Sequence, residues 1–123
     1  MADIRNHRDL VVWQKSMGLV VSCYELTREF PKSETYGLSS QLQRAAVSVP
    51  ANIAEGHGRG STKAFINYLW IANGSLTELE THILIAERLG FSQSTEITPI
   101  IQATHEVGRM LVGLRRSLEA RNS

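Results

Sequence analysis

The 123-residue sequence predicts an all-α fold, an antiparallel up-down-up-down, left-handed four-helix bundle in a single domain. Apolar residues recur at spacings of three and four, and no stretch alternates with the period of two that marks a half-buried strand. Glycine, proline and serine divide this pattern into four segments, at about residues 9–29, 34–56, 62–89 and 95–119. The connections between them are short, so neighbouring helices should run antiparallel.

The first segment, residues 9–29, carries two apolar stripes. We expect one of them to face the bundle core, and it consists of Leu10, Trp13, Met17, Val20 and Tyr24. The other lies roughly 100 to 120° around the helix, and it consists of Val12, Leu19, Cys23, Leu26 and Phe30. An apolar patch of this extent usually marks an interface, so the second stripe predicts a homo-oligomer. The alternative is that two neighbouring helices of one bundle share the wide apolar face.

The second segment begins near Ser33, a plausible N-cap, and ends in the glycine cluster at residues 56–60. Pro50 lies inside it and predicts a kink near Ala46. Its apolar stripe consists of Leu38, Leu42, Ala45, Val49 and Ile53. The segment should therefore pack one face on the core.

The third segment can be capped by Ser61 and ended by Gly90. Its apolar positions alternate strictly between spacings of three and four, which is the heptad pattern of left-handed coiled helices. They are Phe65, Leu69, Ala72, Leu76, Leu79, Ile83 and Ala86. The fourth segment starts between Ser94 and Pro99, and its stripe is Ile97, Ile100, Val107, Leu111, Leu114 and Leu118.

Composition narrows the function classes. The net charge is +1, and the longest apolar runs are a few residues, so we expect no membrane span. The N-terminus carries charges where a secretory signal has its apolar stretch, so nothing marks the chain for export. The single cysteine, Cys23, cannot form an internal disulfide, and a reducing cytoplasmic setting is the simplest interpretation.

Catalytic and metal-binding patterns are scarce. There is no Gly-x-Ser-x-Gly elbow and no Glu-x-x-His motif, and Cys23 lies on an apolar stripe. Glu78 and His82, four residues apart, could share a metal, but an ordinary hydrogen-bonding pair is favoured. The same holds for His105 and Arg109. We therefore expect no enzymatic activity, no cofactor and no metal.

Two polar rows mark the second and third segments. They consist of Gln41, Arg44, Ser48, Asn52 and Glu55 on the former, and of Asn67, Ser75 and Glu78, with His82 in register, on the latter. Small neighbouring residues favour a structural polar seam, in which hydrogen bonds between helices or subunits fix the register. A partly buried Glu55 would then need a donor from a neighbouring helix or subunit. A ligand-binding seam is the alternative.

The glycine cluster at residues 56–60 follows a helix rather than a strand, so it does not indicate a nucleotide-binding fold. A helix C-cap and a turn are its simplest role. Alternatively, free N–H groups at the start of the third helix, with His57, Arg59 and Lys63 beside them, could hold an anion such as an RNA phosphate.

One end of the predicted bundle is basic. The start of the first helix, the loop between the second and third, and the end of the fourth should meet there. They bring together nine basic residues, which are Arg5, Arg8, Lys15, Arg59, Lys63, Arg109, Arg115, Arg116 and Arg121. They face four acidic ones, Asp3, Asp9, Glu55 and Glu119, which leaves +5. These basic residues and His57 are the predicted nucleic-acid-binding residues.

Four segments of the chain resemble a known family. They are FPKSETYGL at residues 30–38, QLQRAA at 41–46, NIAEGHGR at 52–59 and IANGSLTE at 71–78. In order and spacing they resemble the four-helix-bundle proteins encoded in intervening sequences of bacterial large-subunit ribosomal RNA genes. The resemblance implies a cytosolic bacterial bundle that assembles as a ring-shaped homopentamer, without known enzymatic activity or cofactor. In a related branch, the accessory proteins of diversity-generating retroelements, a basic pentameric surface binds nucleic acid and a reverse transcriptase.

Three function classes follow. We favour a non-enzymatic, homo-oligomeric scaffold that binds structured RNA through a basic end, because a cyclic ring points every basic end the same way. The alternatives are a purely protein–protein adaptor scaffold and a small-ligand or metal protein that uses the polar seam.

Overall fold

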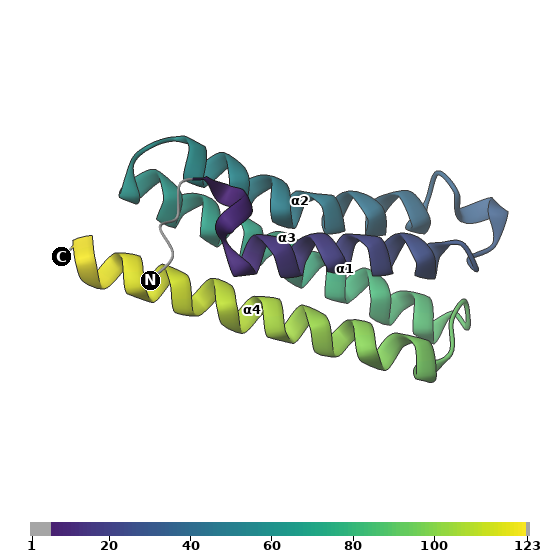
Figure 1. Ribbon diagram of the computed structural model, residues 1–123. Helices are drawn as coiled ribbons and strands as arrows, with labels where there is room; N and C mark the ends of the chain where they lie inside the picture. Colours follow the sequence, from purple (N-terminus) through teal and green to yellow (C-terminus); the bar gives the residue numbers. More distant parts are fainter. Residues whose placement is uncertain (1–5, 123) are drawn as a thin grey trace.

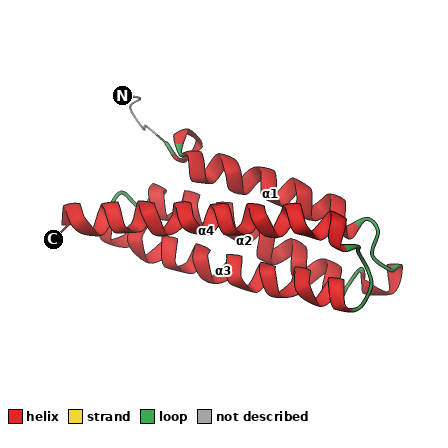
Figure 2. Cartoon of the chain, turned by 90° about the horizontal axis from the view of Figure 1, so that it is seen from below, coloured by secondary structure: helices red, strands yellow, loops and turns green. Residues whose placement is uncertain are grey.

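The computed structural model describes residues 6–122, which are helical apart from short connections (Figure 1). The long helices are α1 (Val11–Thr27), α2 (Leu38–Gly58), α3 (Thr62–Arg88) and α4 (Ser94–Asn122). Two short 3-10 turns, η1 (His7–Asp9) and η2 (Lys32–Glu34), precede α1 and α2. Successive helices run in opposite directions, and α1 and α3 each pack against both α2 and α4 (Figures 1 and 2). The predicted all-α, up-down-up-down bundle is confirmed.

Two of the expected helix ends are confirmed by their hydrogen bonds. The Ser61 hydroxyl accepts the N–H of Ala64 at 3.0 Å and so caps α3. Gly90 follows α3 with a φ of +76°, and the N–H of Phe91 donates to the carbonyl of Ala86 at 2.9 Å. This left-handed glycine with a bond back across the last turn is a common helix stop.

The start of α2 differs from the prediction. The helix begins at Leu38, not at about residue 34, because Lys32–Glu34 form a separate 3-10 turn. The carboxylate of Glu34 then accepts the N–H of Leu38 at 3.0 Å, in place of a cap by Ser33. At its other end α2 continues to Gly58, and it stays helical through Pro50.

The heptad pattern predicted the buried face of α3 completely. All seven of its positions, and no others in this helix, are buried. Leu79 and Ile83 are fully enclosed, and on α2 Leu42, Val49 and Ile53 are as well. The core therefore runs along the full length of the bundle between the four helices.

The two stripes of α1 are exchanged relative to the prediction. The residues expected at an oligomer interface are buried inside the protomer, namely Val12, Leu19, Cys23, Leu26 and Phe30. Of the stripe expected in the core, Leu10 is buried, Trp13 and Val20 are partly buried, and Met17 and Tyr24 are exposed. The interface assignment of those five residues is thus wrong. Their stripe faces both neighbouring helices of the same bundle.

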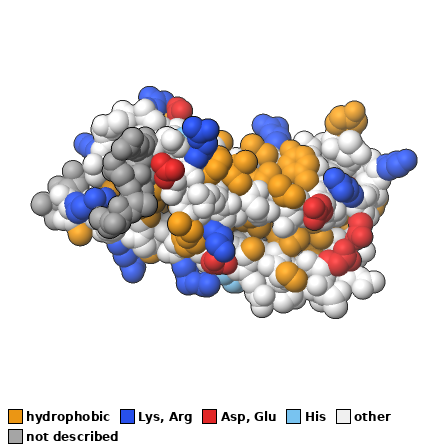
Figure 3. Space-filling model, viewed as in Figure 1, with side chains coloured by type: hydrophobic (Ala, Val, Ile, Leu, Met, Phe, Trp, Pro, Cys, Tyr) orange, Lys and Arg blue, Asp and Glu red, His pale blue; other side chains and the backbone are white. Residues whose placement is uncertain are grey.

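An exposed apolar stripe nevertheless remains on α1. Met17, Val21 and Tyr24 are each more than two-fifths exposed, and so is Val47 on the neighbouring helix α2. Hydrophobic side chains gather over α1 and α2 on the face drawn in Figure 3. We call Met17, Val21, Tyr24 and Val47 the α1–α2 apolar face.

Cys23 is fully buried, and burial raises the pKa of its thiol to about 12. A thiol in this state is a poor nucleophile, because the thiolate is the reactive form. Cys23 is therefore a packing residue. Across the described helices, none is long and apolar enough to cross a membrane.

Candidate nucleic-acid interface

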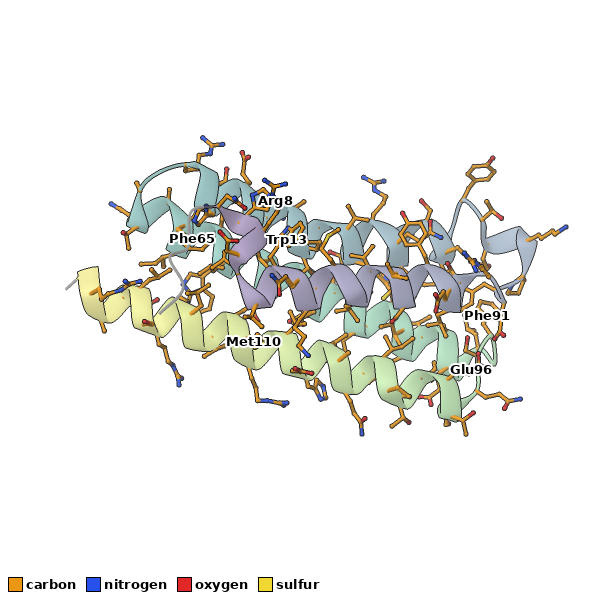
Figure 4. All side chains as sticks on the ribbon, in the orientation of Figure 1. Arg8, Trp13, Phe65, Phe91, Glu96 and Met110 are labelled. Atoms are coloured by element: carbon orange, nitrogen blue, oxygen red, sulfur yellow. The ribbon has the colours of Figure 1, made fainter. Side chains whose placement is uncertain are left out.

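The two halves of the bundle carry opposite charge. The half of the bundle that contains the start of α1, the α2–α3 connection and the C-terminal half of α4 is called the basic half. Arg8 and Phe65 lie there, whereas Phe91 and Glu96 lie at the opposite end (Figure 4). Its described cations are Arg8, Arg59, Lys63, Arg109, Arg115, Arg116 and Arg121. Only Asp9, Glu55 and Glu119 oppose them among the described side chains, so this half carries a net +4.

Two of the predicted basic residues do not add to this half. Arg5 lies outside the described residues. Lys15 lies across from α4 and forms an ion pair with Glu106, at 3.5 Å between Nζ and Oε1. Because Glu106 lies near the middle of α4, we count this pair with the other half, which carries a net −3 over the remaining described residues and is called the acidic half below.

The α2–α3 connection holds one of its charged side chains, that of Arg59, in place. The guanidinium of Arg59 donates to Glu55 at 2.8 Å and to the hydroxyl of Tyr68 at 2.9 Å, and the bond to Glu55 raises the pKa of Arg59 further. His57 is partly buried, with its ring edge-on to Phe65. Lys63 is exposed. The connection therefore presents a positive surface, but Arg59 is already engaged.

The C-terminal half of α4 presents free cations. Arg109 and Arg116 are exposed and make no ion pair or hydrogen bond within the described part of the chain. They line a groove of about 420 Å³ between α3 and α4, together with Asn73, Val112 and two glycines, Gly108 and Gly113. Two turns separate the arginines, about 10 Å along the helix. This row is suited to contact successive charges of a polyanion.

Arg115 has a different role from its neighbour Arg116. Its guanidinium stacks on the ring of Trp70 at 3.6 Å from the centroid, and its Nε lies 3.4 Å from the carboxylate of Glu119. Its side chain is only 13% exposed. Sequence reasoning missed Trp70, although the heptad pattern of α3 excludes residue 70 from the core face and so indicates an exposed tryptophan.

The predicted polar seam forms only in part. Ser48 and Ser75 join α2 to α3, with their hydroxyl oxygens 2.8 Å apart, and Asn52 donates to the carbonyl and hydroxyl of Ser48. Gln41, Arg44 and Glu78 border the same seam, as a polar groove of about 370 Å³. The seam is thus a set of hydrogen bonds at its centre and a solvated groove towards the acidic half.

Two members of the predicted seam lie outside it. Glu55 is exposed, and its donor is Arg59, one turn later on the same helix, so no neighbouring helix or subunit has to supply one. Asn67 is exposed on the outer surface of α3. Both residues lie at the predicted spacing along their helices, but their side chains face solvent.

The two histidine pairs differ in outcome. His82 lies 3.3 Å from Glu78, as an i to i+4 pair, which confirms the expected contact. His105 pairs across helices with Glu80 at 3.2 Å, and not with Arg109. Within residues 6–121, no three His, Cys, Asp or Glu side chains come together as metal ligands.

The acidic half contains a close carboxyl pair. A hydrogen bond to Glu96, followed by the charge of Glu96, raises the pKa of Glu29. A carboxyl whose pKa is higher in the folded state stabilises the fold when it is protonated, and that contribution is lost as the pH rises through the folded-state pKa.

Glu29→Gln is therefore expected to raise the melting temperature at about pH 7, with a difference from the parent that shrinks towards about pH 4. Glu25→Gln removes the same charge one turn earlier, at a carboxyl without a hydrogen-bonded carboxyl partner among the described residues, and serves as the control. Melting curves of the parent and both variants across this pH range test the effect of the Glu29–Glu96 contact. If the melting temperatures of the parent and Glu29→Gln change with pH in parallel, the prediction is contradicted.

The sequence and the fold both have known relatives. The sequence model described as 23S rRNA-intervening sequence protein matches residues 8–113. The chain is also similar to a crystal structure from Bacteroides thetaiotaomicron, described as a protein with unknown function from the S23 ribosomal protein family. The two share 25% sequence identity with a TM-score of 0.77, over 85% of this chain and 98% of that one. No curated protein matches the sequence.

Proposed function

The chain belongs to the 23S rRNA-intervening sequence protein family, and from that premise we propose that it is a non-enzymatic, cytoplasmic scaffold that binds structured RNA through its basic half. The observation that carries the proposal is the segregation of charge. A chain of net charge +1 keeps a net +4 among the described residues of one half and a net −3 in the other. Such a field attracts a polyanion to one side of the molecule only.

The proposal includes a ring-shaped homopentamer. The α1–α2 apolar face supports self-association, because Met17, Val21, Tyr24 and Val47 each leave more than two-fifths of their surface in water. The number five is carried over from the resemblance described above. In a cyclic ring every copy points the same way, so five basic halves would concentrate about 20 positive charges on one side.

A protein–protein adaptor is the second candidate, and the same apolar face favours it. If that face binds a different protein rather than another copy of the chain, the purified chain is a monomer and forms a larger complex only when its partner is added. Light scattering of the purified chain at micromolar concentration separates the two. A stable monomer would exclude the ring.

A pair of matched double variants tests the RNA site. Arg109→Glu with Arg116→Glu is expected to weaken binding of an RNA hairpin at least about tenfold, because two phosphate contacts are lost and two repulsive charges are added. Arg28→Glu with Arg88→Glu changes the net charge equally, at exposed positions of the acidic half. The control pair should leave the affinity, measured by fluorescence anisotropy, close to that of the parent.

Equal weakening by both pairs would mean that only the overall charge matters. If the parent does not bind the hairpin at low salt, the proposal is contradicted. The measurement therefore separates a located RNA site from a diffuse electrostatic attraction and from the adaptor function.

A further inference from the structure

Trp70 is the largest aromatic side chain that the bundle leaves in water. The residue is 53% exposed, although the guanidinium of Arg115 covers one face of its indole at 3.6 Å. Because one ring face is covered, the exposed half of the residue is contributed by the opposite face and the ring edges.

The groove of Arg109 and Arg116 begins beside this indole. Trp70 does not line the 420 Å³ groove, but it lies near it, because Asn73 of the groove wall follows one turn after Trp70 on α3 and Arg116 follows Arg115 on α4. At Gly113 a side chain would meet no heavy atom within 4 Å, which leaves that part of the groove open. The surface thus combines a flat aromatic face with an open groove.

A second groove, of about 330 Å³, extends the first towards the middle of the bundle. The two share Asn73, Gly108 and Arg109. At its far end Glu80 pairs with His105 and brings negative charge to the wall. A polyanion should therefore follow the groove from Trp70 past Arg116 to Arg109 and leave it before Glu80.

We propose that Trp70 is a stacking platform for an unpaired base of RNA, whose neighbouring phosphates contact Arg116 and Arg109. The proposal rests on the RNA-binding function given above and makes the substrate class specific to single-stranded nucleotides, such as those of a hairpin loop. Bases stack on aromatic side chains because every base has a π-face, and the arginine on the far side of the indole adds a cation–π contact. In an A-form duplex the base faces are hidden by their neighbours, so a fully paired RNA could use the arginines but not the indole.

The experiment compares an RNA hairpin that has an open loop with a blunt RNA duplex of equal length. The chain has two tryptophans, so Trp13→Phe leaves Trp70 as the single indole reporter. The hairpin is expected to quench the fluorescence of Trp70, whereas the duplex is expected to leave it unchanged. In the otherwise unmodified chain, Trp70→Ala should weaken hairpin binding about tenfold or more and leave duplex binding within about twofold.

Trp70→Phe is the conservative control, because it keeps an aromatic face and should retain most of the hairpin affinity. Melting curves of both variants check that the loss of the Arg115 contact leaves the bundle folded. If Trp70→Ala binds the hairpin as the parent does, while Arg109→Glu with Arg116→Glu binds it weakly, Trp70 only locks α3 to α4 and the stacking proposal is overturned. If the parent binds neither RNA, the proposed function itself fails.

Discussion

Leu19→Glu is expected to unfold the chain, whereas Met17→Glu, two residues earlier on the same helix, is expected to leave the fold intact. Leu19 is 3% exposed and Met17 is 42% exposed. A carboxylate in place of Leu19 would lie in the core without a cation to pair with, at a cost of about 3–5 kcal/mol. This is a large part of the stability of a domain of ordinary size, about 5–15 kcal/mol.

Met17→Glu instead places the charge on the α1–α2 apolar face. In the proposed ring this variant should separate the protomers and keep the helical circular dichroism signal. Urea unfolding and light scattering on both variants read out the two effects. A folded, dissociated Leu19→Glu together with an unfolded Met17→Glu would mean that α1 is rotated from the orientation described above.

Gly56→Ala is expected to destabilise the protein by about 1–3 kcal/mol, although alanine is the better helix former by about 1 kcal/mol. A Cβ at Gly56 would lie 2.5 Å from the Cβ of Tyr68 and 3.2 Å from Cδ1 of Phe65. The Cβ of Tyr68 is fixed to the backbone of α3, so the clash can be relieved only if the two helices separate. Glycine is required here for close approach and not for an unusual backbone angle.

Gly58→Ala is the matched control, two residues later on the same helix. A Cβ there would meet nothing within 4 Å. Its expected effect is neutral or stabilising by up to about 1 kcal/mol, because only helix propensity changes. Thermal unfolding of both variants gives the comparison. A Gly56→Ala variant as stable as the parent would contradict the close contact of α2 with α3.

The sequence predicted α3 well because its heptad stripe is unbroken, whereas its exposed apolar residues, such as Trp70 and Leu84, are separated by polar positions. Its seven heptad positions are its seven buried residues, and the Ser61 cap follows from a side-chain hydrogen bond within one turn. Local spacing and local capping suffice where the other apolar residues of a helix form no second continuous stripe.

The orientation of α1 could not be predicted in the same way, because both of its stripes are apolar. The buried face contains two hydroxyl residues, Ser16 and Thr27. Each donates to the carbonyl three residues earlier, Trp13 and Tyr24 respectively, so its burial leaves no hydroxyl unpaired. The exposed stripe carries the larger Met17 and Tyr24. Apolar spacing alone could not distinguish the two stripes, and packing against α2 and α4 decides between them.

The sequence predicted where the basic residues of the candidate site gather, but it did not predict their contacts. The up-down-up-down order brings the basic termini and the α2–α3 connection to one half, as expected. Which basic residues remain free depends on pairs between helices, such as Arg115 with Trp70 and Lys15 with Glu106. Those pairs depend on the relative heights of the helices, which spacing along one chain segment does not specify.

The salt dependence of RNA binding by the unmodified chain tests the central claim most directly. If Arg109, Arg116 and a third cation of the basic half each neutralise one phosphate of a single strand, the slope of log affinity against log salt is about −2 per protomer. The affinity for an RNA hairpin should then fall about 20-fold between about 50 and about 200 mM salt. A fall of this size or steeper is the predicted result, and an affinity that is unchanged over this range, or no binding at the lower salt, would contradict the account.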